Sequence, residues 1–112
     1  MAAIDPREHG EKVCDGSIRR AFDFLGKRWS GVILGTLMNG AAGFAELKRA
    51  IDGISDSVLS DRLVELADAD LVRRTVDPGP PVTVSYELTE AGQGLLPALN
   101  ALATWAEENL AP

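Results

Sequence analysis

The sequence predicts a mainly α-helical fold that carries one β-hairpin. Between residues 17 and 70, apolar residues recur in four stretches with the three-to-four-residue period of a helix. Residues 71–88 change to the alternation typical of strands, and residues 90–110 return to the helical period. A chain of 112 residues is expected to form one domain with a modest core.

The first two helices are predicted over residues 17–25 and 29–38. Ser17 is expected to cap the first helix, because its hydroxyl can accept a hydrogen bond from a backbone N–H of the first turn. Gly26 is expected to end that helix. The turn-forming residues 39–40, Asn-Gly, end the second helix.

A third helix is predicted from Gly43 to Ile51, and residues 52–53, Asp-Gly, end it. Ser55 is expected to cap a fourth helix over residues 56–70. The apolar stripe of the fourth helix consists of Val58, Leu59, Leu63, Leu66 and Ala67.

Two strands, residues 71–76 and 82–88, are predicted next. Residues 77–81 contain three prolines and a glycine and can form only a turn or a stiff tip between them. A last helix is predicted over residues 90–110, with a kink at Pro97 because proline lacks the N–H that an inner helical turn needs.

This order of elements is that of a winged helix-turn-helix. In that fold the fourth helix enters the major groove of DNA and the hairpin reaches toward the backbone or the minor groove. Residues 1–16 are expected to form a flexible N-terminal arm, and residues 17–112 the winged domain with a C-terminal dimerisation helix. No signal-peptide core or membrane-spanning run is present, so the chain is expected to be cytoplasmic, with no membrane partner.

Composition argues against most catalytic functions. One cysteine and one histidine allow no intrachain disulfide, no usual metal site and no cofactor, and no Gly-rich phosphate loop or catalytic triad can be assembled. An enzyme is therefore not expected. The net charge is −6, but residues 17–51 carry six basic residues against two acidic ones. This distribution permits DNA binding without arguing for it.

The chain resembles the HxlR-type regulators, a bacterial winged-helix group related in architecture to the MarR family. The resemblance covers about residues 13–110 and rests on motifs in a specific order. They are Cys14, residues 25–29 (LGKRW), 44–49 (FAELKR), 53–55 (GIS), 58–63 (VLSDRL), 80–81 (PP) and 86–92 (YELTEAG). The resemblance implies a homodimer built from the first and last helices, an inverted-repeat operator and repression of a neighbouring operon.

Helical geometry selects the residues expected to face DNA. With Leu59 at the centre of the buried face, Ser57 and Asp61 lie about 160° away. Arg73 and Arg74 must point to opposite sides of the hairpin, and which of them faces DNA is left open. A merely solvated helix face is the alternative. The predicted DNA-binding residues are Ser55, Ser57, Ser60, Asp61, Arg62, Lys48, Arg49, Arg73, Arg74 and Thr83.

The apolar stripe of the last helix, which ends in Trp105 and Leu110, is more than a small monomer needs to bury, and it predicts a homodimer interface. The resemblance adds the first helix to that interface. Its expected residues are Ile18, Phe22, Leu95, Leu99, Leu102, Trp105 and Ala106.

Cys14 is a candidate redox sensor, because in some members of the HxlR-type family, which this chain resembles, the equivalent cysteine senses oxidants or electrophiles. The alternative is an inert, partly buried thiol. A small-molecule effector is a further candidate partner.

Two positions that commonly carry basic residues in that family hold Ser57 and Val82 here. This difference and the acidity favour the rival function, a winged-helix protein–protein interaction module with weak or no DNA binding.

Overall fold

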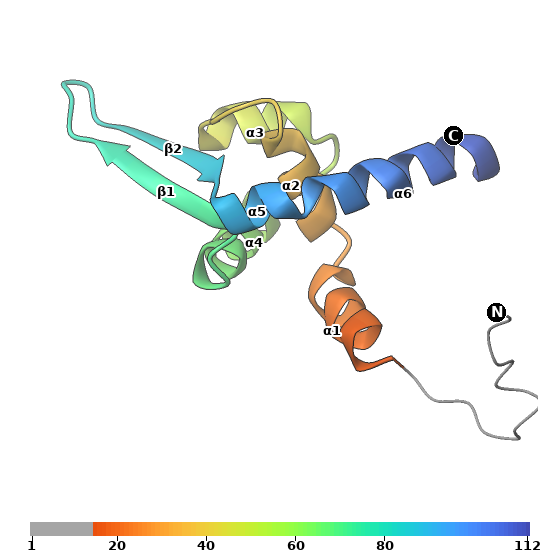
Figure 1. Ribbon diagram of the computed structural model, residues 1–112. Helices are drawn as coiled ribbons and strands as arrows, with labels where there is room; N and C mark the ends of the chain where they lie inside the picture. Colours follow the sequence, from red (N-terminus) through yellow and green to blue (C-terminus); the bar gives the residue numbers. More distant parts are fainter. Residues whose placement is uncertain (1–14) are drawn as a thin grey trace, which may run out of the picture.

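The computed structural model describes residues 15–112, and its elements follow the predicted order (Figure 1). The helix-turn-helix is formed by α3 and α4, and the hairpin of β1 and β2 is the wing, so the predicted winged helix-turn-helix fold is confirmed. The elements are α1 (Gly16–Leu25), α2 (Ser30–Leu37), α3 (Phe44–Ala50), α4 (Asp56–Asp68), β1 (Val72–Asp77), β2 (Thr83–Leu88), α5 (Glu90–Gly94) and α6 (Leu96–Asn109).

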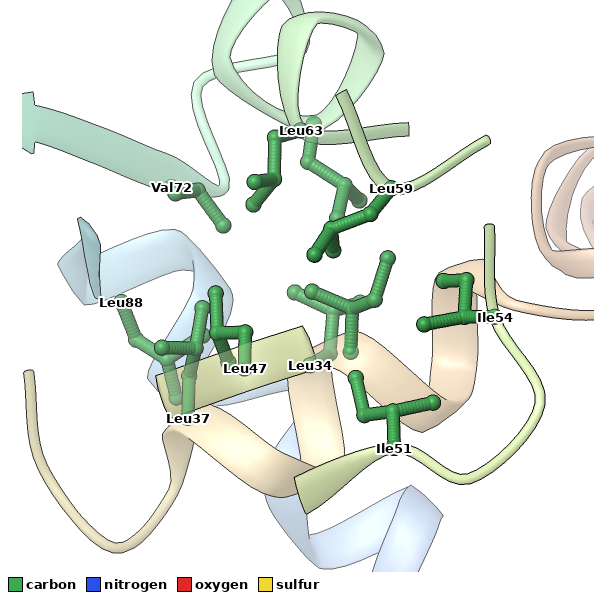
Figure 2. Packing of buried hydrophobic residues seen from close by; sticks show 11 residues of the cluster. Leu34, Leu37, Leu47, Ile51, Ile54, Leu59, Leu63, Val72 and Leu88 are labelled. Atoms are coloured by element: carbon green, nitrogen blue, oxygen red, sulfur yellow. The ribbon is translucent and has the colours of Figure 1, made fainter. Parts of the chain in front are cut away.

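The hydrophobic core lies where α2, α3 and α4 meet the base of the wing (Figure 2). Leu34 of α2, Leu47 of α3 and Leu59 of α4 are fully buried. Val72 of β1 and Leu88 of β2 complete the cluster from the wing. Burying a leucine side chain contributes about 1.5–3 kcal/mol. The rotation of α4 about its own axis is therefore fixed by the leucines on its inner face.

The wing is joined to the helices at its base. β1 and β2 are antiparallel, with Val72 opposite Leu88 and Arg74 opposite Tyr86. Ala42, in the connection between α2 and α3, also pairs with Tyr86 through two backbone hydrogen bonds of 2.9 and 2.8 Å. These bonds hold the wing against the helix-turn-helix, while its tip extends away from the helices (Figure 1).

Two helix ends differ from the predictions. Asp15, not Ser17, caps α1: its carboxylate accepts hydrogen bonds from the backbone N–H groups of Ser17, at 2.7 Å, and Ile18. A carboxylate also interacts favourably with the positive end of the helix dipole. The fourth helix ends at Asp68 rather than at residue 70, because Asp70 adopts a left-handed conformation with φ of 61°.

The C-terminal region forms two helices rather than the one kinked helix predicted over residues 90–110. α5 ends at Gly94, and α6 begins after an interruption at Leu95. Pro97 lies in the first turn of α6, where its missing N–H costs no intrahelical hydrogen bond. In a continuous helix Pro97 could not donate to the carbonyl of Gln93 and its ring would clash with that carbonyl, so α5 ends before Pro97 and a new helix begins.

Within residues 15–112, no helix is both long and apolar enough to cross a membrane. In the same part of the chain, no group of three or more His, Cys, Asp or Glu side chains is placed to hold a metal ion.

Candidate nucleic-acid interface

The outward face of α4, defined here as Ser57, Ser60 and Asp61, is exposed as predicted. Leu59 and Leu63 of the same helix are buried, so the helical period alone turns the polar side chains away from the core. The three side chains offer two hydroxyls and one carboxylate. Short groups of this kind can form hydrogen bonds to base edges or, for the hydroxyls, to phosphates.

Ser55 caps α4, as predicted. Its hydroxyl oxygen accepts a hydrogen bond from the backbone N–H of Val58 at 3.2 Å. The same oxygen lies 3.5 Å from the hydroxyl of Ser57. The capping bond keeps Ser55 at the start of the outward face and occupies one of its acceptor positions, so its first role is to fix the N-terminus of α4.

Arg62 is turned toward the core edge rather than outward. Its side chain is 19% exposed, and its Nη2 donates to Glu65 Oε1 at 3.0 Å. Lys27, which precedes α2, donates to both oxygens of the same carboxylate, at 2.7 and 3.0 Å. The hydrogen bond from Lys27 is the main cause that lowers the pKa of Glu65, with the charges of Arg62 and Lys27 adding to it. Both cations are thus engaged with one acid.

Lys48 and Arg49 are adjacent on α3 but differ in their contacts. The Lys48 Nζ donates to the backbone C=O of Ile54 at 2.6 Å and lies 3.1 Å from the carboxylate of Asp56. It therefore connects α3 to the start of α4. Arg49 is exposed and forms no ion pair with any residue of the described range. Of the two, Arg49 has the side chain that is available to a phosphate.

The strand register separates Arg73 from Arg74. Arg73 lies opposite Glu87 and forms an ion pair with it at 3.2 Å. Arg74 lies opposite Tyr86, on the face of the wing that is turned toward α4. Thr83, another predicted contact, is exposed and shares the Arg73 face, so it is not brought together with the outward face of α4.

A groove of about 390 Å³ lies between α4 and the wing. Ser60 and Val64 of α4 form part of one wall, and Arg74 and Tyr86 of the wing form part of the other. Arg74 makes no ion pair within residues 15–112. A guanidinium that is free to form hydrogen bonds beside the Ser60 hydroxyl is suited to a phosphate of the DNA backbone, and the Asp68 carboxylate in the same groove opposes that binding.

The predicted dimer residues fall into two groups. Phe22 of α1 and Trp105 of α6 are 58% and 53% exposed, and Ile18 and Leu102 are similarly exposed. Neither α1 nor α6 has a buried residue. By contrast, Leu95, Leu99 and Ala106 are only partly exposed, and the two leucines pack against the core of this protomer. These leucines serve the protomer's own packing as well as any partner surface.

Three contacts that position the interface were not assigned from the sequence. The pairing of Lys27 with Glu65 joins residues 38 positions apart, and no local pattern predicts it. The three-residue spacing of Arg62 and Glu65 on one helix was a usable signal for their ion pair. The backbone β-bridge between Ala42 and Tyr86 could have been suspected, because residues 41–42 lie between two glycines, Gly40 and Gly43. Cys14, the candidate redox sensor, lies outside the described residues.

Comparison with known proteins places these features in one family. Residues 24–112 match the model of the HxlR-like helix-turn-helix family. The HTH-type transcriptional regulator YodB of Bacillus subtilis is 39% identical over 103 residues, which cover 92% of this chain and 91% of YodB.

Solved structures agree with the sequence comparison. The reduced form of YodB is 38% identical, with a TM-score of 0.77, and the match covers 89% of this chain and 98% of that one. YodB is also solved in a quinone-bound form, which is 36% identical over 85% of this chain and 99% of that one, with a TM-score of 0.72. The redox regulator HypR in its oxidised form is 29% identical, with a TM-score of 0.80 and coverage of 86% and 99%.

Proposed function

Because the chain belongs to the HxlR-like family of helix-turn-helix transcriptional regulators, we propose that it is a homodimeric, cytoplasmic repressor without catalytic activity that binds an inverted-repeat operator. The observation that carries the proposal is the exposed outward face of α4 beside Arg74. In this proposal α4 enters the major groove, and Arg74 and Arg49 contact phosphates on either side of it.

Exposed apolar surface supports the dimer. α1 and α6 project from the helical body (Figure 1), and Phe22 and Trp105 lie on them without burial in the protomer. A second copy would cover both faces in a self-complementary interface. A twofold dimer of winged helices places its two reading helices about one DNA turn, ~34 Å, apart. An inverted repeat is therefore the operator symmetry that fits.

Charge explains why phosphate contacts must be few. The net charge of −6 opposes DNA, and Lys27, Lys48 and Arg62 are occupied within the protein. The cations left for phosphates in this region include Arg49 and Arg74. We expect the affinity for DNA to fall with salt, but the slope of log affinity against log salt should be small compared with other regulators. The reason is that this slope scales with the number of neutralised phosphates.

Electrophoretic mobility shift on the DNA upstream of the chain's own gene tests the proposal against the rival function, a protein–protein interaction module. A shift that resists unrelated competitor DNA, with log affinity falling linearly with log salt, supports the regulator. Binding no tighter than to a shuffled duplex of the same composition would contradict it.

The similarity to YodB and HypR supports a release signal as well. We propose that an oxidant or a quinone-like electrophile releases this chain from its operator by modifying Cys14, its single cysteine. Treatment with diamide is expected to abolish the gel shift of the natural chain and to leave that of a Cys14→Ser variant intact. Equal loss in both proteins would remove Cys14 from the mechanism.

A further inference from the structure

The charge of α4 is unusual for a helix proposed to enter the major groove. Asp56–Asp68 contains four acidic residues and one basic residue, Arg62. Two of the acids are neutralised by ion pairs: Asp56 by Lys48, and Glu65 by Lys27 and Arg62. The other two, Asp61 and Asp68, have no ion-pair or hydrogen-bond partner among residues 15–112.

Asp61 and Asp68 occupy different places on the helix. Asp61 is exposed and lies in the N-terminal half of α4, on the outward face with Ser57 and Ser60. Asp68 is the last helical residue. Asp68 lies on the same side of α4, about 20° away around the helix axis, but two turns further along, where it lines the groove with Ser60 and Arg74. Because Arg62 is held back by Glu65, Asp61 is the one charged side chain among the residues that define the outward face. Its carboxylate is therefore the charged group closest to the DNA bases in the proposed complex.

We propose that Asp61 determines base specificity, by accepting a hydrogen bond from the N4 amino group of a cytosine in each operator half-site. This inference rests on the proposed function and names what the outward face of α4 recognises. An ionised carboxylate only accepts hydrogen bonds. In the major groove, cytosine presents a donor, whereas guanine presents two acceptors and thymine an acceptor and a methyl group. Adenine offers a donor, but its N7 acceptor lies beside it and repels a carboxylate.

The same charge makes Asp61 a group that discriminates rather than one that adds affinity. A carboxylate near the backbone is repelled by phosphates, and the contact with cytosine offsets that repulsion only at the correct base. A wrong base pair at one position of a specific site typically costs about 5- to 140-fold in affinity, which corresponds to about 1–3 kcal/mol. Ser57 and Ser60, which accept or donate, can adapt to several bases and are expected to discriminate less.

Selection from a random duplex library, with sequencing of the bound DNA, tests the assignment. The full natural chain is expected to enrich an inverted repeat with one required cytosine in each half-site. Asp61→Ala is expected to enrich the same repeat without a preference for cytosine at that position. Asp61→Asn keeps the shape of the side chain, and its amide can bond to both N6 and N7 of adenine. In that variant we expect the preference at the same position to change from cytosine to adenine.

Asp68→Asn is the matched control, because it removes the same charge from the same helix. It is expected to keep the cytosine preference. Retention of that preference in both Asp61 variants, or its loss in Asp68→Asn as well, would overturn the assignment while leaving the regulator proposal intact. A natural chain that enriches no motif at all would instead overturn the proposed function, and the role of Asp61 with it.

Discussion

Replacing Arg74 by alanine is expected to weaken DNA binding and flatten its salt dependence, whereas replacing Arg73 should change little. The two arginines are adjacent on β1 and carry the same charge. Arg73 is engaged by Glu87 at 3.2 Å, and Arg74 borders the groove beside α4 without an ion-pair partner in the described residues. The pair of variants therefore separates a phosphate contact from a change in net charge.

The size of the effect follows from counterion release. Each phosphate contact adds about 0.9 to the slope of log affinity against log salt, and a dimer carries two copies of Arg74, so the slope should decrease by about 1.8. Between about 50 and about 200 mM salt, the natural chain should then lose about 12-fold more affinity than Arg74→Ala. The measurement is fluorescence anisotropy of a labelled operator duplex over a salt series. Equal slopes for the natural chain and Arg74→Ala, or an equal decrease in Arg73→Ala, would refute the reasoning.

Two further predictions concern the dimer and the acid near Arg62. Trp105→Glu places a charge on the exposed apolar face of α6, so this variant should have the mass of a monomer in sedimentation equilibrium. The control is Val76→Glu, at a residue of the wing that is 48% exposed, and it should keep the mass of the dimer. A dimeric Trp105→Glu protein would exclude this face. Because Lys27 holds the pKa of Glu65 below its usual 4.5, the ion pair stabilises the fold above that pH, and this stability is lost as the pH falls through the lowered pKa. Urea unfolding midpoints of the natural chain and Glu65→Gln should therefore differ near pH 7 and converge in acid, and a difference that persists in acid would contradict this.

The parts of the interface that depend on helical period could be predicted from the sequence. Leu59 and Leu63 are apolar at helical spacing, so the exposure of Ser57 and Asp61 follows from geometry once α4 is assigned. The cap at Ser55 followed from residue type alone. At α1 the same rule gave the wrong residue, because both Asp15 and Ser17 are good caps and the sequence does not rank them.

Which basic side chains are paired within the protein, and which remain available to DNA, could not be predicted, because the pairing depends on residues far apart in the chain. Strand alternation places Arg73 and Arg74 on opposite faces, but only the packing of the wing against α4 shows which face each has. Lys48 is a plausible phosphate contact in the sequence, and its partner is a backbone carbonyl in the turn before α4. Lys27 meets Glu65 only after the helices have packed.

Hydroxyl-radical footprinting of the natural chain on its selected duplex tests most directly whether a dimer presents two copies of α4 and the wing to DNA. We expect two protected segments on one face of the duplex, related by inverted symmetry, with centres about one helical turn apart. A single unsymmetrical segment, or protection that vanishes with unrelated competitor DNA, would contradict a dimeric, sequence-specific regulator.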